Sequence, residues 1–535
     1  MFELRPLRIA EAEKVLADLC EDSATGPDMV PARIPKRAAS VLALPLLLLA
    51  ERIFAEGRWP EPWTTHWIVP LYKKGVVFKA GNYRGIYLST QLSKAMERLI
   101  GSLWIPRVSR DLYVGEQQFA YRSGRGSRDA LAFVVLTWLE GFMRKSRFAM
   151  YLSDVSGAFD RVRAERLILK MRNKRIPEAI IEVVASWLRG RRAQVVVGGS
   201  KSGLMLLMNQ VFQGTVWGPV LWNLFYEDSN AAMKKQEFVE IKFADDLNAF
   251  KEFDPGVEDA ELFKAMDACQ VELHRWGEAN QVVFDAGKEG KRILSRSRPV
   301  GDSFTLLGIQ FDCKLIMNTA IDALLSKCRW KLRSLLRCQR HYDVRAMVQL
   351  YKSRLLGYIE YRTAAIYHAC ETSLSQVDAI QRQFLDHFGI SDEAALMEFN
   401  LAPLNTRRDI AMLGLIHRSV IGAGCPQFSR FFVVRPGPHP PGRHKRQLKE
   451  YRNGDVTDYM FPNSKPADYV MRSALGLTTV YNLLPAEIVE AKSTAAFQSR
   501  LQKLVKDECR RSRKTWETLL SPRWEMQFHP LHSLA

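Results

Sequence analysis

Apolar residues recur at helical spacing over several long segments of the chain. Positions three and four residues apart share one face of an α-helix, so this spacing predicts amphipathic or buried helices. The expected helices cover residues 37–56, 88–105, 127–145, 163–173, 177–189 and 220–233, with further basic, leucine-rich helices within 320–357. The most apolar run, VLALPLLLLA at 41–50, is about half as long as a membrane span requires, so we expect a buried helix there.

Strand patterns are few and short. Residues 67–72, the segment FAMYLSDV at 148–155 and the segment AQVVVGG at 193–199 combine apolar with β-branched or aromatic residues, which favours strands. Residues 239–250 are predicted to form two strands that meet at an acidic pair. Short strands among many helices predict an α+β architecture.

The acidic pair, Asp245 and Asp246, lies inside the apolar stretch KFADDLNAF, and Asp154 ends another apolar strand. A buried carboxylate is costly unless it is paired, protonated or bound to a metal. If the two strands are neighbours, three carboxylates converge, and such a set binds hard divalent cations, Mg²⁺ above all. The alternative interpretation is a solvated hairpin turn with acidic residues.

Composition narrows the class of protein. A chain of 535 residues predicts roughly two to four domains or subdomains. The net charge of +19 favours a polyanionic partner, nucleic acid before an anionic membrane. The N-terminus has no signal-peptide core, and the eight cysteines show no CxxC spacing. We therefore expect an intracellular protein, in the nucleus or the cytoplasm, without a membrane partner or a disulfide-linked partner.

Three segments in order, YLSDVSGAFDRV, QGTVWGPVLWNLFY and KFADDLNAF, resemble motifs A, B and C of reverse transcriptases. The detailed similarity is to the enzymes of non-LTR (LINE-type, jockey-like) retrotransposons. Other segments resemble further blocks of that family in the expected order: ATGPDMVPARI, PLYKKG with NYRGIYL, EQQFAYRSGRGSRDAL, LLGIQFD and TVYNLLPAEIVEAKSTAAFQSRL.

The resemblance implies a right-hand polymerase fold with fingers, a palm built on a small antiparallel sheet with helices, and a helical thumb. The expected domains are an N-terminal helix at 1–22, fingers and palm at 23–312, a helical thumb at 313–400, and a basic C-terminal region at 401–535 with a linker near 435–446. The implied activity is RNA-directed DNA polymerisation, in which dNTPs extend a DNA primer on an RNA template. The implied cofactor is two Mg²⁺ ions, with Mn²⁺ as a substitute.

The resemblance also assigns the acids. Asp154 and Asp245 are expected to bind the metal ions, and Asp246 is expected nearer the primer end than the metals. The Val155 carbonyl is expected to complete one coordination shell. The ring of Phe159 is expected to collide with a ribose 2′-hydroxyl and so select dNTPs, with ordinary core packing as the alternative.

Motif B supplies two further expectations. Gln213 would hydrogen-bond the incoming nucleotide, and Gly214 would let the backbone approach the template without a Cβ. The alternative is a turn glycine beside a polar cap.

Cations complete the expected dNTP site. Arg84 and Lys73 are expected to contact the triphosphate, and Arg122, less strongly, the triphosphate or the template. Lys288 resembles the motif D lysine, which would protonate the leaving pyrophosphate, although Lys291 is close enough to compete. For any one of the surface cations the alternative is a solvated charge.

A basic segment at 327–340 would lie along the template–primer backbone. Its expected contact residues are Lys327, Arg329, Trp330, Lys331 and Arg333. A solvated amphipathic helix is the alternative.

The chain departs from the family pattern in its upstream blocks and in motif B, at Ser23, Met29, Gly85, Tyr87 and Trp217. We also expect no endonuclease domain ahead of the polymerase. Two other functions stay open: a catalytically silent RNA-binding remnant of a retrotransposon polymerase, and an RNA-templated RNA polymerase, which Phe159 disfavours.

Overall fold

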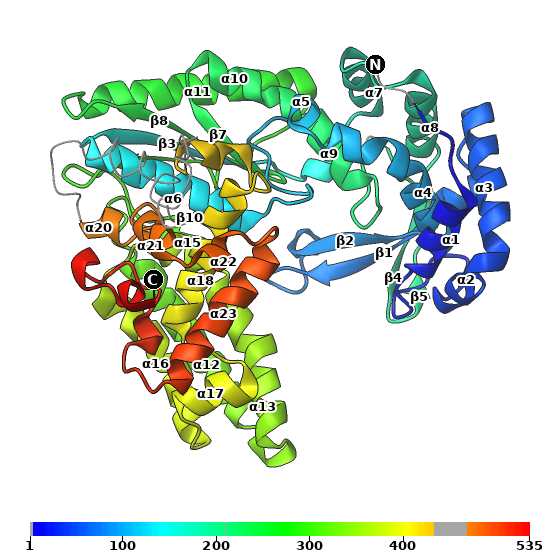
Figure 1. Cartoon of the computed structure of the whole chain (residues 1–535). Coiled ribbons are helices and arrows are strands. Elements are labelled where there is room, and N and C mark those ends of the chain that lie inside the picture. The colour runs from blue at the N-terminus through cyan, green and yellow to red at the C-terminus, as the bar shows by residue number, and fades with distance from the viewer. Residues whose placement is uncertain (1–3, 209, 433–467, 535) are drawn as a thin grey trace, which may run out of the picture. The chain divides into compact units, whose positions relative to one another are not determined.

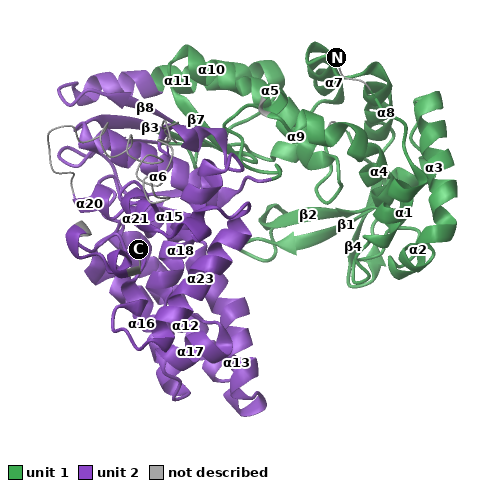
Figure 2. Cartoon of the chain, viewed as in Figure 1, with its two compact units in different colours: residues 1–123, 151–249, 267–290 green, residues 124–150, 250–266, 291–535 purple. Residues whose placement is uncertain are grey.

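A computed structural model of the chain describes residues 4–208, 210–432 and 468–534 (Figure 1). The predicted linker near 435–446 lies outside these residues. The chain forms two compact units (Figure 2). Unit 1 comprises residues 1–123, 151–249 and 267–290, and unit 2 comprises 124–150, 250–266 and 291–535.

Unit 1 is a mixed unit of helices and strands. Its helices are α1 Ile9–Ala17, α2 Arg33–Arg37, α3 Ala39–Glu56, α4 Gln91–Val108, α5 Asp111–Val114, α7 Ala164–Asn173, α8 Glu178–Leu188, α9 Gly218–Tyr226 and α10 Asn230–Lys235. Its strands are β1 Thr65–Tyr72, β2 Tyr83–Leu88, β4 Arg192–Val197, β5 Ser200–Lys201, β6 Met205–Leu206 and β7 Val239–Phe243.

Unit 2 is mainly helical. Its helices are α6 Ser127–Met143, α12 Asn318–Leu336, α13 Val344–Tyr351, α14 Gly357–Glu360, α15 Thr363–Ile366, α16 Glu371–His387, α17 Asp392–Phe399, α18 Leu404–Val420, α20 Asp468–Met471, α21 Leu477–Leu483, α22 Ala486–Val489 and α23 Thr494–Arg510. Strands β10 Phe304–Leu306 and β11 Ile309–Phe311 form a hairpin. The unit boundaries fall inside β3 Arg147–Asp154, β8 Asp246–Phe253, β9 Gly290–Leu294 and α11 Asp259–Asn280.

The strands within the described residues form three sheets, of which the β10–β11 hairpin is the smallest. A five-stranded sheet has the order β2-β1-β4-β5, with β6 also paired to β4. In it β1 and β2 are antiparallel, with Tyr72 opposite Tyr83. A four-stranded sheet has the order β7-β8-β3-β9. All eight residues of β3 are buried, as expected for an apolar strand between two neighbours. The predicted α+β class is confirmed.

Most of the predicted elements are confirmed. The expected helices at 127–145, 163–173 and 177–189 are α6, α7 and α8, and the expected strand at 148–155 is β3. The expected single helix at 220–233 is instead broken, because a 3₁₀ turn at Glu227–Ser229 separates α9 from α10. No helix within the described residues is both long enough and apolar enough to cross a bilayer.

The run at 41–50 forms a helix, but the prediction that it is buried is wrong for one face. The side chains of Val41, Leu44 and Leu48 are 74%, 50% and 54% exposed, whereas Leu46 is buried. The reason is that α1, α4 and α8 pack against α3 and cover only part of its circumference. The apolar composition of a run does not indicate whether a helix is buried on all sides or on one face only.

Candidate active site

The hairpin of β7 and β8 carries the two adjacent acids. Strand β7 ends at Phe243 and β8 begins at Asp246, so Ala244 and Asp245 form the turn. Ala244 has a φ of +60°, a left-handed conformation that is uncommon for a residue with a Cβ. The predicted meeting of two strands at the acidic pair is therefore confirmed, and the turn is tight enough to need support.

Two buried side chains supply that support. The Gln118 side chain donates from Nε2 to the Ala244 carbonyl (3.3 Å) and accepts at Oε1 from the Ala244 N–H (3.1 Å). The Trp222 indole N–H donates to the same carbonyl (2.9 Å). A buried polar network with both partners satisfied fixes local geometry. Neither residue was predicted to act at the site, and the only signal was their place in EQQFAYRSGRGSRDAL and in motif B.

Asp154 ends the strand that pairs with β8. It is the last residue of β3 and is only 8% exposed. Because β3 lies beside β8, whose first residue is Asp246, the predicted adjacency of the two acidic strands is confirmed. The Asp154 carbonyl accepts from the Asp285 N–H (2.9 Å), and its carboxylate contacts the Lys288 ammonium.

The three carboxylates influence one another. Burial, followed by the charges of Asp245 and Asp154, raises the pKa of Asp246 to about 7. Burial also raises the pKa of Asp245, with Asp154 adding to the effect and Arg84 and Lys288 opposing it. Like charges within reach of one another disfavour full ionisation, so this cluster is stabilised by a cation.

The cluster offers oxygen donors of the kind that Mg²⁺ prefers. Within the described residues, however, no group of three or more His, Cys, Asp and Glu side chains is arranged as a metal site. The cation that contacts Asp154 is the Lys288 ammonium. Beside the cluster, the fully buried Tyr226 hydroxyl has no hydrogen-bond partner among the described residues. Charges on Asp245 and Asp154 help to raise the pKa of that hydroxyl, after burial and Glu240. The donor set and this orphaned hydroxyl fit a site for divalent ions and ordered water.

The next segment after Asp154 places two further predicted residues. Val155 is 2% exposed and bridges to Phe284. On either side of Val155, the Asp154 carbonyl accepts from the Asp285 N–H and the Ser156 N–H donates to the Val283 carbonyl. Neither of these two hydrogen bonds uses the Val155 carbonyl. Phe159, 7% exposed, stacks on Trp222 with ring centroids 5.9 Å apart. Its ring is therefore held rigidly, and both nucleotide selection and core packing remain compatible with this position.

Motif B lies against β2. The Tyr87 N–H donates to the Gln213 carbonyl (2.8 Å). Gly214 has a φ of +104°, and a Cβ built there would lie 2.7 Å from the Tyr87 carbonyl oxygen. Gly214 is therefore needed for the approach of the chain's own backbone, independently of any template.

The predicted cations differ in their surroundings. Lys73 and Arg84 are both exposed. The charge of Arg84 opposes the raised pKa of Asp245, a member of the cluster, whereas the charge of Lys73 opposes the raised pKa of Asp160, which lies outside it. Arg122 instead donates to the chain's own carbonyls, among them Ser109 (2.9 Å) and Gly115 (2.8 Å). The structure thus brings Arg84 and Lys288 near the acidic cluster, places Lys73 near Asp160, and uses Arg122 to fix a loop.

The predicted template–primer residues lie on α12 in unit 2. One face of this helix is buried, with Leu324, Cys328 and Leu332. Lys327, Arg329, Trp330 and Arg333 are exposed and Lys331 is half-buried. The Lys327 ammonium lies 4.9 Å from the Trp330 ring centroid. The helix is amphipathic, as expected, and its exposed face is basic and aromatic.

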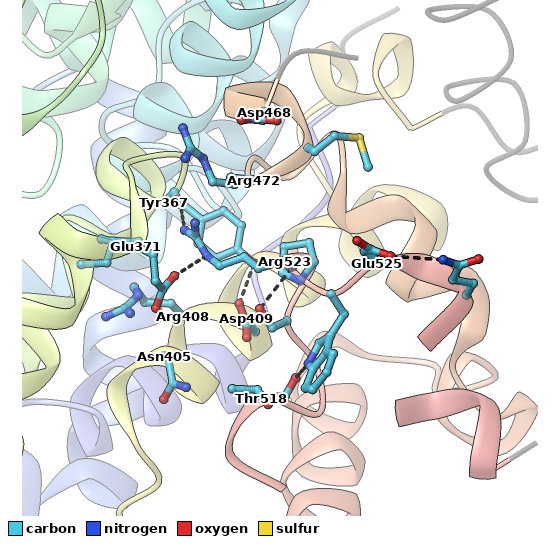
Figure 3. A pocket seen from close by; sticks show the side chains of 16 residues that line it. Tyr367, Glu371, Asn405, Arg408, Asp409, Asp468, Arg472, Thr518, Arg523 and Glu525 are labelled. Carbon is cyan, nitrogen blue, oxygen red and sulfur yellow. Dashed lines mark hydrogen bonds and ion pairs between the residues drawn. The ribbon is translucent and has the colours of Figure 1, made fainter. Parts of the chain in front are cut away.

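Unit 2 also contains a cavity of about 990 Å³ between α16, α18 and the segment 518–527 (Figure 3). Its charged groups contact one another: the Tyr367 hydroxyl donates to Asp409 (2.6 Å), and Arg523 pairs with Glu371 (3.0 Å). Burial raises the pKa of Asp409 to about 7. None of the predicted site residues is among the described residues that line this cavity. The cavity and the acidic cluster are therefore separate places in the fold. The acidic cluster is the candidate active site, because its grouped carboxylates are the oxygen donors that hard divalent cations prefer.

Comparison with known proteins gives consistent matches. Residues 71–280 match the family described as "Reverse transcriptase (RNA-dependent DNA polymerase)". The "RNA-directed DNA polymerase from mobile element jockey" of Drosophila funebris is 25% identical over 403 residues, covering 71% of this chain and 43% of that protein. The protein of the same description from Drosophila melanogaster is 25% identical over 409 residues, covering 71% and 44%. The chain thus spans less than half the length of these relatives.

Among solved structures, the chain resembles "Structure of apo telomerase from Candida Tropicalis truncated from C-terminal domain" at 12% identity. The match covers 54% of this chain and 62% of that one, with a TM-score of 0.36, which is too low to establish a shared fold.

Proposed function

Because the chain belongs to the reverse transcriptase family of jockey-like non-LTR retrotransposons, we propose that it is an RNA-directed DNA polymerase that extends a DNA primer with dNTPs. The observation that carries the proposal is the pairing of β3 with β8, which groups Asp154, Asp245 and Asp246. In this proposal residues 23–312 are fingers and palm and residues 313–400 are a thumb.

The three carboxylates and the Val155 carbonyl would hold two Mg²⁺ ions. Ions bound there would neutralise charge on the phosphoryl oxygens and favour ionisation of the primer hydroxyl. The role of the protein is to hold the carboxylates in place. The paired strands β3 and β8 carry Asp154 and Asp246. The two hydrogen bonds between the Gln118 side chain and the Ala244 backbone, which we call the Gln118 clamp, fix the turn that carries Asp245. Such positioning supplies much of the catalysis of phosphoryl transfer.

Residues around the cluster would recognise the nucleotide. Arg84 and Lys73 are exposed cations, which suits contact with a triphosphate, and the charge of Arg84 opposes the raised pKa of Asp245. The Phe159 ring, fixed by its stack on Trp222, would exclude a ribose 2′-hydroxyl by steric collision. Gln213 would hydrogen-bond the incoming nucleotide from a segment whose backbone is tied to Tyr87.

Lys288 would act as the proton donor to the departing pyrophosphate. Its hydrogen bond to Asp154 raises the pKa of the ammonium, so Lys288 is protonated at neutral pH. A group that holds its proton this tightly is a poor donor, so the role requires that Lys288 lose its hydrogen bond to Asp154 when that carboxylate binds metal, which would lower the pKa of the ammonium. The exposed face of α12 would contact the template–primer backbone, where contacts are independent of base sequence.

The direct test is primer extension on an RNA template, with dNTPs or NTPs, in Mg²⁺. The expected result is extension with dNTPs that EDTA abolishes and that added Mg²⁺ or Mn²⁺ restores. Template binding without any extension would favour the catalytically silent RNA-binding remnant. Preferential use of NTPs would favour an RNA-templated RNA polymerase.

A further inference from the structure

The loop that joins β1 to β2 is held in one conformation by the residues at its base. Three consecutive carbonyl oxygens accept side-chain hydrogen bonds: Gly75 from Tyr72 Oη (2.6 Å), Val76 from Asn82 Nδ2 (2.7 Å) and Val77 from Tyr83 Oη (2.8 Å). The Lys73 N–H also donates to the Asn82 carbonyl (2.8 Å) across the loop base. A loop with this many internal bonds is ordered before it meets any partner, which lowers the entropic cost of binding.

The ordered loop presents apolar side chains to solvent. Val76 and Val77 are 55% and 52% exposed, and Phe78 is 93% exposed. Phe78 is the most exposed large apolar side chain in the described part of the chain. Exposed apolar groups that cluster on a rigid loop are typical of a contact surface, whereas single scattered ones are not informative. The β1–β2 hairpin that carries this surface is labelled in Figure 1.

The charged residues of the loop that carries Phe78 are all basic. Lys73, Lys74 and Lys79 are exposed in the same loop, and Arg84 is exposed on β2. No Asp or Glu occurs in the sequence between Glu61 and Glu97. A partner that covers this surface must therefore combine negative charge with a flat apolar face.

We propose that this loop, residues 73–82, binds unpaired bases of a nucleic-acid strand, with Phe78 stacked on a base and Lys74 and Lys79 contacting the flanking phosphates. Every nucleobase has a flat π face and every linkage a negative charge, so a ring among cations fits single strands irrespective of sequence. The inference rests on the proposed function, because it takes the polymerase's template as the strand.

Contacts within unit 1 indicate which part of the strand is held. The Tyr87 N–H, near the end of β2, donates to the Gln213 carbonyl (2.8 Å), and the nearby Val211 N–H donates to the Phe159 carbonyl (2.9 Å) in the segment that follows Asp154, so the hairpin is tied to the elements beside the acidic cluster. A base stacked on Phe78 therefore belongs to the unpaired template close to the site of nucleotide addition. Phe78 is a positioning residue for the template and does not touch the reacting atoms.

The test measures binding of the full chain to a primer–template whose single-stranded RNA overhang carries 2-aminopurine. Stacking quenches this base, so the wild type is expected to quench its fluorescence. Phe78→Ala is expected to remove the quench and weaken binding about 10-fold, the size of one stacked base. Phe78→Tyr is expected to restore both. Val41→Ala, which truncates an exposed apolar side chain on α3, is the matched control and is expected to change neither.

Salt dependence separates stacking from charge. Phe78→Ala is expected to leave the slope of log affinity against log salt unchanged, whereas Lys79→Ala is expected to reduce it. Replacing the quenched base with an abasic site is expected to weaken binding by the wild type by the same factor as Phe78→Ala does. The same replacement is expected to leave the affinity of Phe78→Ala unchanged. Repeating the series with a DNA overhang shows whether the loop distinguishes RNA from DNA.

Several outcomes would overturn the inference. If Phe78→Ala binds and quenches as the wild type does, the loop does not hold a base, even where primer extension is intact and the proposed function stands. If Phe78→Ala changes only the sedimentation of the protein, the surface is a protein contact. Base stacking without any primer extension would instead support the loop's role and contradict the polymerase activity.

Discussion

At the scale of single residues, Gly214 is fixed by the protein's own backbone. Its φ of +104° and the 2.7 Å approach of a Cβ to the Tyr87 carbonyl both exclude a side chain. We predict that Gly214→Ala lowers the free energy of unfolding by about 1–3 kcal/mol. Gly203→Ala, at a position with open space and no positive φ, is the control. Equal urea midpoints for the two variants would show that the backbone tolerates the change.

Phe159 poses the question of whether a buried ring also selects the sugar. Its stack on Trp222 holds the ring in place, and a shorter side chain would open the space that a 2′-hydroxyl needs. We predict that Phe159→Val raises the ratio of kcat/KM for NTPs to that for dNTPs by about 10-fold or more. Phe238→Val truncates another buried ring of unit 1 and serves as the control. If this ratio of kcat/KM values is the same in Phe159→Val and Phe238→Val, Phe159 contributes to core packing and does not select the sugar.

At the scale of elements, the β7–β8 hairpin depends on a clamp from a distant segment. Gln118 bonds both backbone groups of Ala244, at the turn that carries Asp245. We predict that Gln118→Ala slows single-turnover primer extension about 100-fold, because a displaced catalytic group costs rate rather than template affinity. Gln194→Ala removes a side-chain amide that bonds the Ser202 carbonyl in another sheet and is the matched control. A rate for Gln118→Ala equal to that of the control would show that the turn holds itself.

At the scale of the whole molecule, stability should depend on pH through His368. This imidazole is buried in unit 2, and its Nε2–H donates to the Leu315 carbonyl (3.0 Å). Burial lowers its pKa from 6.5 to about 4. The folded state binds a proton at His368 less readily than the unfolded state does. The contribution of His368 to the free energy of unfolding is therefore full above pH 6.5 and is lost as pH falls towards 4.

We predict that the titration of His368 lowers the wild type's free energy of unfolding by up to about 3 kcal/mol as pH falls from 6.5 to 4. His368→Gln keeps a donor for Leu315 but does not titrate, so its urea midpoint should fall less over the same range. Asp409, whose pKa is raised by burial, acts in the opposite direction in both proteins and cancels in the comparison. Parallel pH profiles for the two proteins would remove His368 as the cause.

The sequence predicted the features that depend on neighbouring residues. The helices α6, α7 and α8 and the strand β3 follow from local periodicity, and the acidic hairpin follows from an apolar run interrupted by two carboxylates. Features set by distant contacts were missed. The Gln118 clamp joins residues 126 positions apart, and the exposed face of α3 depends on which helices pack against it. Sequence spacing contains no information on such partners, which only the folded chain brings together.

We propose that the acids grouped by β3 and β8 catalyse nucleotide addition. The most direct measurement is single-turnover extension of a DNA primer on an RNA template, with dNTPs and Mg²⁺, by the wild type, Asp245→Asn and the control Glu278→Gln. Template affinity is measured in parallel. We predict extension by the wild type and by Glu278→Gln, whose side chain is exposed on α11, and none by Asp245→Asn with template affinity retained. Extension by Asp245→Asn at the rate of the wild type would show that the Asp245 carboxylate is not needed for nucleotide addition.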